Sequence, residues 1–416
     1  MGGVWLLVRR SLRQHYLSTV VTVLSAALAS GLVMTVFSLQ RQSYEAFTGG
    51  AGGFDAVLGA RGSALQLVLN SVFHLDTSPG NIPWSMYRAI ERDPRVALAI
   101  PYAVGDNFRG FRIVGTVDKL FTEVEPRPGH HYAFAAGAPF APTAPEAVIG
   151  ATVAERTGLR VGSTFHPYHG LTYDAASEHS DTYRVVGVLK PTSTPVDRVV
   201  WIPIEGLYRL SGHVLRGTGE TYSPEAGQAI PDAAKEVSAV MLKLRSNQAG
   251  MMLSQTINHQ GKAATLAWPI GRVMADLFNK LGWMARVLTF IAYLVMVVAA
   301  AGILASVYNT INERRREFAI LRAIGARQQT VFAAVVLEAA TIAGLGGLAG
   351  YLVCAVVLAA AAAVVRAQTG VMLQFHSLHP ALIWTPLAMV ALGALAGLIP
   401  ARSAYRTDVA ANLIPH

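Results

Sequence analysis

The stretch Ile311–Phe332, "INERRREFAILRAIGARQQTVF", is a charged island in an apolar chain. It holds seven charged residues, although only 14% of all residues are charged. The run before it, "VLTFIAYLVMVVAAAGILASVY", ends at Tyr308, and a second long apolar run begins at Val331. A helix that crosses a membrane needs about 20 mostly apolar residues, and each flanking run reaches that length. The stretch therefore predicts a charged connector between two membrane spans.

The overall composition places the chain among membrane proteins. It has 416 residues, 52% of them hydrophobic, and a mean hydropathy of +0.39, which is high for a soluble protein. The net charge of +9 would suit nucleic acid, but the arginines lie mainly beside apolar runs, where membrane topology explains them. We therefore expect no nucleic-acid partner. The single cysteine, Cys354, excludes a disulfide within the chain and thiol metal clusters.

Four apolar segments are long enough to cross a bilayer. The first could instead be a signal peptide, because Arg9, Arg10 and Arg13 precede it, but its apolar stretch exceeds the usual ~7–15 residues. We therefore favour four spans surrounded by membrane lipid. Their predicted bounds are residues 16–39, 283–309, 330–365 and 381–401.

The distribution of positive charge predicts how these spans are oriented. Arginines gather before the first span, in the connector and after the fourth span, whereas the last loop has no Lys or Arg after Arg366. Lys and Arg are enriched on the cytoplasmic side of membrane proteins. The segments expected in the cytoplasm are 1–15, 310–329 and 402–416, and those expected outside it are 40–282 and 366–380.

The region between the first two spans has the mixed pattern of an α+β domain. Short runs rich in Val, Ile and aromatic residues indicate strands, and they alternate with helical patterns and glycine turns. The predicted fold class is an α+β membrane protein with four transmembrane helices and a large external domain between the first and second. The predicted strands are 54–60, 97–104, 111–117, 182–189, 198–204 and 238–244, and the predicted helices are 83–91, 249–258 and 272–281.

Motifs for ATP hydrolysis and for common hydrolases do not occur in the sequence. There is no G-x-x-x-x-G-K-[ST] phosphate-binding loop, no G-x-S-x-G elbow and no H-E-x-x-H zinc motif. The chain is therefore predicted not to be an enzyme. Active transport by it would need energy from another subunit.

One external loop, "FHPYHGLTYDAASEHSD", is rich in imidazole and carboxylate groups. It holds His166, His169 and His179 together with Asp174 and Glu178. Imidazole and carboxylate ligands suit zinc or copper, so the three histidines are candidate ligands of a zinc ion. Two alternatives stay open: pH sensing by imidazoles that titrate near neutrality, and ordinary surface histidines.

Two further features each allow a functional and a structural interpretation. Glu338 lies about two turns into the third span, and a carboxylate inside a membrane is a functional candidate by default. We favour the alternative that it lies near the cytoplasmic interface and pairs with a neighbouring arginine. The external segment Gly59–Trp84 contains glycines and the apolar run "LQLVLNSVF". It could line a hydrophobic substrate groove, or it could pack in the domain core.

The connector itself has the pattern of a short amphipathic helix. We predict that the second span continues into it as a helix, with Phe318, Leu321 and Gly325 on one face and Ile320 and Ile324 beside them. Gly325 is suited to end this helix. The arginines could serve only to bind lipid headgroups, but an apolar stripe among charges also suits a helix that docks into a partner's groove.

The longer stretch "NTINERRREFAILRAIGARQQTVFAAVVLEA" resembles the signature of the FtsX-like permease family, which includes MacB and the lipoprotein-releasing transporters LolC and LolE. The family pattern E-R-x-x-E-[FI]-[AG]-[IV]-L-[RK]-[AS]-[IL]-G-A is followed by a helix with a glutamate. Two external stretches, "EAVIGATVAERTGLRVGSTF" and "YRVVGVLKPTSTPVDRVVWIPIEGL", also resemble the family's external domain. The residues that fill the family pattern are Glu313, Arg314, Glu317, Phe318, Leu321, Arg322, Gly325, Ala326 and Glu338.

The resemblance implies the permease subunit of a type VII ABC system in the bacterial inner membrane, with residues 283–405 as its FtsX-like domain. Two permease copies would pair with cytosolic ATPase subunits, so that ATP acts through a partner. The connector would be the coupling helix, and the helices would transmit motion to the periplasm to export or handle lipoprotein, lipid or peptide, with a periplasmic partner possible. The implied ATPase-coupling residues are Glu313, Arg314, Arg315, Glu317, Phe318, Leu321, Arg322, Ile324, Gly325 and Ala326.

The chain also departs from the family. MacB carries an ATPase domain on the same chain, and this sequence shows none; neither the histidine loop nor Gly59–Trp84 belongs to the family pattern. Two other functions therefore stay open. One is a regulator that transports nothing and activates a periplasmic enzyme. The other is a metal-linked membrane protein that uses the histidine loop.

Overall fold

The computed structural model describes residues 2–49, 52–127, 129–169, 179–209, 230–373 and 379–405. The chain divides into two compact units. The helical unit comprises the described residues up to Ser43, from Leu281 to Ala363 and beyond residue 378. The β-rich unit comprises those from Tyr44 to Lys280 and from Val364 to Leu373.

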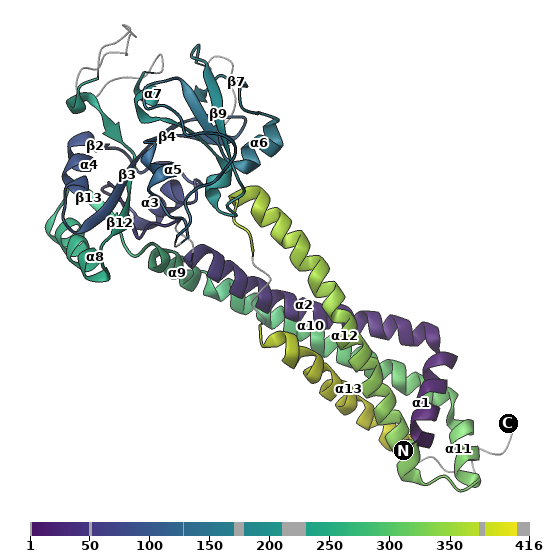
Figure 1. Ribbon diagram of the computed structural model, residues 1–416. Coiled ribbons are helices and arrows are strands. Elements are labelled where there is room, and N and C mark those ends of the chain that lie inside the picture. Colours follow the sequence, from purple (N-terminus) through teal and green to yellow (C-terminus); the bar gives the residue numbers. More distant parts are fainter. Residues whose placement is uncertain are drawn as a thin grey trace. The chain divides into compact units, whose positions relative to one another are not determined.

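Four helices of the described chain are long and apolar enough to cross a membrane. They are labelled in Figure 1. With 42 residues at 1.5 Å per residue, α12 is about 63 Å long, which is about twice the ~30 Å of a bilayer's hydrocarbon core. Of two shorter helices in the same unit, one precedes the first long helix and the other lies between the second and the third. The bounds are α1 (Gly2–Gln14), α2 (Tyr16–Thr48), α10 (Gly282–Glu313), α11 (Arg315–Ala323), α12 (Gln328–Thr369) and α13 (Ala381–Tyr405).

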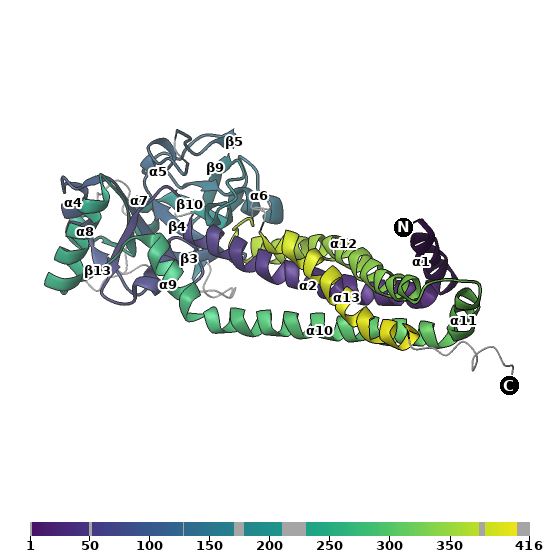
Figure 2. The same cartoon turned by 90° about the horizontal axis from the view of Figure 1, so that it is seen from below.

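Small residues allow these helices to approach closely, and α2 and α12 lie side by side in Figure 2. Gly350 of α12 faces α2, where a Cβ on the glycine would lie 2.7 Å from Ser30 Oγ and 2.9 Å from the Gly31 nitrogen. Because lipid offers little hydrophobic driving force between helices, close packing of small residues is what holds such bundles together. This explains the abundance of Gly and Ala in the apolar runs.

The β-rich unit is built on one mixed sheet whose strand order is β13-β1-β12-β3-β4-β10-β6-β9-β5. The long strand β3 connects its two halves, because residues Val96–Tyr102 pair with β12 and Ala103–Phe108 pair with β4. β7 adds to β9, and β8 adds to β3. The bounds are β1 (Ala56–Ala60), β3 (Val96–Phe108), β4 (Phe111–Thr116), β5 (Phe134–Gly137), β6 (Glu146–Ile149), β7 (Thr164–Phe165), β8 (Tyr168–His169), β9 (Tyr183–Leu189), β10 (Val199–Pro203), β12 (Ala239–Leu244) and β13 (Ala264–Ala267).

Both faces of this sheet are covered. The neighbours Val57 and Leu58 on β1 point to opposite faces, and each is fully buried in a different hydrophobic cluster. Strands buried on both faces read as continuous apolar runs. The remaining elements are β2 (Ile82–Pro83), which pairs with β11 (Glu236–Val237), and the helices α3 (Ala64–Ser71), α4 (Trp84–Glu91), α5 (Lys119–Thr122), α6 (Ala151–Thr157), α7 (Ile204–Tyr208), α8 (Asn247–Ser254) and α9 (Ile270–Lys280).

The observed architecture confirms the predicted fold class of an α+β membrane protein with a large domain between the first two long helices. Two local features lie beyond the prediction, and a third differs from it. The segment before the first span forms the helix α1, and α12 extends to Thr369, where Gly370 (φ +76°) ends it. The second span does not run unbroken into the connector, because the helix breaks at Arg314.

Candidate functional site

The break at Arg314 is the centre of the connector. α10 ends at Glu313 and α11 begins at Arg315, and between them Arg314 leaves helical geometry with φ −100° and ψ 10°. Its N–H still donates to the carbonyls of Thr310 and Ile311. The bend turns the Arg314 side chain inward, so that only 7% of it is exposed.

Arg314 joins a polar network with groups from three other elements, in which Ser11, Arg314 and Glu338 are buried and the Glu317 side chain is 49% exposed. Its Nη1 donates to Ser11 Oγ of α1 at 2.6 Å, and Ser11 Oγ in turn donates to Glu338 Oε1 of α12 at 2.6 Å. Arg314 Nη1 also lies 3.8 Å from Glu338 Oε2, and its Nε donates to Glu317 Oε2 of α11 at 3.0 Å. We call Ser11, Arg314, Glu317 and Glu338 the Arg314 network.

The network shows what Glu338 contacts. The carboxylate is buried and pairs with an arginine of the connector, as in the interpretation that we favoured, while its position near the cytoplasmic interface stays a prediction. A buried charge is tolerated when it is paired and hydrogen-bonded, and both conditions hold for Arg314 and Glu338. The guanidinium also lies 5.1 Å from the ring centre of Phe318. These contacts hold α1, α12 and the junction of α10 and α11 together at one point.

The two faces of α11 differ from the predicted single apolar stripe. Phe318 and Ala319 are buried in the core of the helical unit, and Leu321 packs partly against it. Ile320 and Ile324 are 46% and 77% exposed. The expected solvent-facing stripe is therefore divided, because the bend at Arg314 turns one half of it into the bundle.

Gly325 ends α11 as the sequence suggests. Its φ is +103°, a conformation that favours glycine, and its N–H donates to the Arg322 carbonyl at 3.1 Å. The N–H of Ala326 donates to the Leu321 carbonyl at 3.0 Å. This pair of bonds is the Schellman pattern, which satisfies the last carbonyls of a helix. Glu313 is exposed and lies 3.5 Å from His15, and the side chain of Arg315 lies outside the described part.

The β-rich unit brings two of the three predicted metal-ligating histidines together. His169 and His179 gather around Asp106 of β3, and ligand atoms of all three lie within 4.8 Å of one another. His169 Nδ1 is 2.7 Å and His179 Nε2 is 3.6 Å from Asp106 Oδ1. The two imidazole rings are 4.3 Å apart and nearly perpendicular. We call these three residues the Asp106 cluster.

Sequence reasoning missed Asp106. It lies some sixty residues before the histidine loop, and only the antiparallel pairing of β3 with β8, which sets Asp106 opposite His169, brings them together. The available signal was a carboxylate at the end of a strongly apolar strand. His166 is exposed and is not a member of the cluster, and Asp174 and Glu178 lie outside the described residues.

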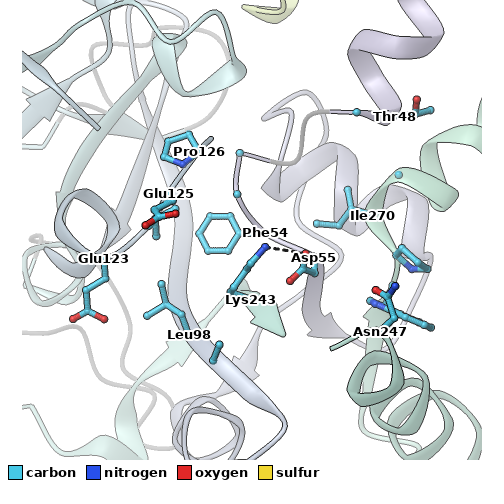
Figure 3. Close-up of a pocket in the computed structure, with 18 residues that line it drawn as sticks. Thr48, Phe54, Asp55, Leu98, Glu123, Glu125, Pro126, Lys243, Asn247 and Ile270 are labelled. Atoms are coloured by element: carbon cyan, nitrogen blue, oxygen red, sulfur yellow. Dashed lines mark hydrogen bonds and ion pairs between the residues drawn. The ribbon is translucent and has the colours of Figure 1, made fainter. Parts of the chain in front are cut away.

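A separate cavity of about 870 Å³ opens in the β-rich unit (Figure 3). Phe54, Leu98 and Glu125 are among its lining residues, and Lys243 Nζ reaches across to Asp55 Oδ1 at 3.2 Å. Its volume suits a small ligand. None of the site residues predicted from the sequence lines it, and neither does Gly59–Trp84.

The segment Gly59–Trp84 instead contributes to the core. Its helix α3 places Leu67 and Val68 in the interior, both fully buried. The hydroxyl of Ser63 accepts from the Gln66 N–H at 3.3 Å and caps the helix. The apolar run "LQLVLNSVF" is therefore explained by ordinary packing.

Comparison with known proteins gives two family matches that together cover most of the chain. Residues 19–272 match the MacB-like periplasmic core domain, and residues 289–409 match the FtsX-like permease C-terminal family. The first match alone covers more than half of the sequence.

Individual relatives are similar over shorter lengths. The macrolide export ATP-binding/permease protein MacB of Shewanella sp. (strain W3-18-1) is 25% identical over 234 residues, which are 54% of this chain and 32% of the relative. The pyoverdine export ATP-binding/permease protein PvdT of Pseudomonas syringae pv. tomato is 32% identical over 123 residues, 30% of this chain and 18% of the relative. The matches thus span about a third or less of these curated relatives. The periplasmic region of MacB from Actinobacillus actinomycetemcomitans aligns with a TM-score of 0.34 at 10% identity, over 56% of this chain and 94% of that one.

Proposed function

The chain belongs to the family of ABC transporter permeases that combine a MacB-like periplasmic core domain with an FtsX-like C-terminal domain, and from this premise we propose that it couples a separate cytosolic ATPase to work outside the membrane. The β-rich unit is then the periplasmic domain, in a bacterial inner membrane. The arginine-rich connector and both chain ends face the cytoplasm, in agreement with the positive-inside rule. Two permease copies assemble with the ATPase subunits.

The observation that carries this proposal is the shape of α11. It exposes Ile320 and Ile324 at its end, and it is fixed to the bundle by Arg314. Two exposed isoleucines on a short charged helix suit a helix that docks into a hydrophobic groove. In this proposal the ATPase is the protein that docks on α11, and ATP binds to the ATPase.

Transmission of motion follows from the Arg314 network. A displacement of α11 by the ATPase pulls on Arg314, and Arg314 contacts α1 through Ser11 and α12 through Ser11 and Glu338. Buried, hydrogen-bonded groups such as Ser11, Arg314 and Glu338 form a rigid connection, so the displacement is passed to α1 and α12 rather than absorbed in the loop. α12, at 42 residues, is the longest helix of the described chain.

The proposal is tested by charging the exposed pair. The double variant Ile320→Asp plus Ile324→Asp is expected to reduce ATPase binding at least about 30-fold, because burying an isoleucine side chain is worth ~1.5–3 kcal/mol and a carboxylate in a groove adds a cost. The matched control, Ile320→Leu plus Ile324→Leu, retains the apolar surface and is expected to bind normally.

The measurement is co-purification of the ATPase with the tagged permease from the native membrane, with the amount of each protein quantified. Both variants must be recovered from the membrane at wild-type levels, since the substituted side chains lie on the surface. ATPase recovery that is equal for the Asp and Leu variants would refute α11 as the docking element. The same purification identifies the ATPase and any periplasmic protein that the complex acts on.

A further inference from the structure

We propose that the Asp106 cluster is a zinc-binding site of the external domain, in which Asp106, His169 and His179 supply three ligands and the fourth position is open to water or an external ligand. This inference stands on the β-rich unit alone and does not depend on coupling to an ATPase. It replaces the ligand set that the sequence predicts by exchanging His166 for Asp106.

The donor set matches the metal. Zinc binds imidazole nitrogen at ~2.0–2.1 Å and carboxylate oxygen at ~2.0–2.2 Å, and sites with three protein ligands commonly keep a fourth position for water or substrate. In a tetrahedral site, ligand atoms at these distances are about 3.3 Å apart. The observed separations from Asp106 Oδ1, 2.7 Å to His169 and 3.6 Å to His179, lie on either side of that value. Binding of the ion requires the His169 nitrogen and the Asp106 oxygen to move apart by about 0.6 Å.

The backbone holds the three ligands in place before any metal arrives. Asp106 and His169 are directly paired across β3 and β8, and side chains on such a pair have Cβ atoms only ~4.5–5.5 Å apart. His179 is positioned by its N–H, which donates to the Pro167 carbonyl at 2.9 Å, just before β8. The hydroxyl of Tyr168 accepts from the Gly110 N–H at 3.1 Å and fixes β8 further. The site is therefore largely preformed.

Burial supports an ion and also offers a path to it. Asp106 is fully buried and the His179 side chain is 4% exposed, whereas the His169 side chain is 48% exposed. Buried carboxylates in proteins are paired or coordinate metals. The exposed edge of His169 gives a metal a path to the cluster.

The ion would connect parts of the chain that are distant in sequence. Asp106 belongs to the strand that joins the two halves of the sheet, and His179 precedes β9. Because a ligand that binds only the folded state stabilises it, zinc is expected to raise the melting temperature of the protein, by about 5 °C at a large excess over Kd. A hydrogen-bonded His–carboxylate group without metal would give no such shift.

The experiment uses the full chain, purified in detergent and stripped with a chelator. Zn²⁺ is titrated against a chromophoric competitor, and Co²⁺ is added separately to read the coordination geometry from its visible spectrum. We expect one Zn²⁺ per chain and a Co²⁺ spectrum of tetrahedral intensity. Loss of a ligand in His169→Ala or Asp106→Asn should weaken binding at least about 100-fold, since even an outer-shell partner contributes 10–100-fold.

His166→Ala is the matched control and should bind Zn²⁺ like the wild type. His169→Ala changes an exposed side chain, so its fold should persist even where Asp106→Asn, at a buried position, unfolds. Melting temperatures in metal-free buffer distinguish the two cases. Failure of the wild type to bind Zn²⁺ at micromolar concentrations, or equal binding by wild type and His169→Ala, would overturn the assignment.

Discussion

Ser11 offers the sharpest test of the Arg314 network, because it is the bridge between two buried charges. Ser11→Ala removes two charge-assisted hydrogen bonds, one from Arg314 and one to Glu338, each 2.6 Å long. Such bonds contribute ~1.5–3 kcal/mol each. Arg314 and Glu338 remain 3.8 Å apart, and at an effective dielectric constant of ~20 their attraction of roughly 4 kcal/mol draws them together and recovers part of the loss. We expect a net loss of about 2–3 kcal/mol in the free energy of unfolding.

The assay is equilibrium unfolding of the purified chain in mixed micelles with increasing denaturing detergent. Ser25→Ala is the matched control, because the Ser25 hydroxyl is exposed and, within the described residues, bonds only to the Val21 carbonyl of its own helix. Its effect should stay within about 0.5 kcal/mol. In a Glu338→Ala background, Ser11→Ala should cost at least about 1 kcal/mol less than in the wild type, as expected for groups in one network.

The two results that contradict this reasoning are distinct. If Ser11→Ala matches Ser25→Ala, the bridge contributes nothing to stability, and α1 is not held to α12 by this contact. If Ser11→Ala is costly but its effect is unchanged in the Glu338→Ala background, the hydroxyl acts by packing alone. In either case the proposed route of motion from α11 to α12 through Ser11 loses its support.

Two further predictions concern packing and pH. Gly350→Ala should destabilise the bundle by about 1–3 kcal/mol, because its Cβ would lie 2.7 Å from Ser30 Oγ. Gly302→Ala, with open space around it, should be neutral or stabilising. Unfolding in mixed micelles compares the two variants, and equal effects would contradict close packing at Gly350. Burial against aromatic rings and the nearby Arg112 lower the pKa of His74 from 6.5 to about 3. Below pH 6.5 the unfolded chain therefore gains a proton that the folded chain does not. As the pH falls, the free energy of unfolding of the wild type relative to His74→Phe should decrease by about 1.4 kcal/mol per pH unit. If the difference between the two proteins does not change with pH, the pKa of His74 is not lowered by folding.

The parts of the fold that could be read from the sequence are those governed by local pattern. Apolar runs of about 20 residues specify the long helices, and runs such as "RVVWIPI" specify strands because both faces of the sheet are buried. Positions where tertiary contacts decide the structure could not be read. α1 is an example. Its arginines indicated only which side of the membrane it lies on, but α1 is a helix that packs against other elements, with Val8 and Ser11 buried.

The candidate sites follow the same division. Gly325 was predictable, because a positive φ at a helix end selects glycine from local geometry alone. The sequence predicted that Glu338 pairs with an arginine. It did not predict that Ser11 bridges the two, because Ser11 and Glu338 are 327 positions apart in the sequence. Asp106 was missed for a similar reason. Its position beside His169 depends on the register of β3 against β8, which is a long-range property.

The connector reverses the usual distribution of residues in a surface helix, and this reversal supports the proposal that a partner docks on α11. Arg314, a charged residue, is buried at 6% exposure, while Ile324, ten residues later, is 77% exposed. Positive-inside topology accounts for arginines near a membrane but not for burying one of them. A single exposed isoleucine is ordinary in any protein, yet here Ile320 and Ile324 lie one helical turn apart on the element that Arg314 fixes. Rigid attachment on one side and an apolar surface on the other are the two properties that a helix needs in order to receive force from another protein.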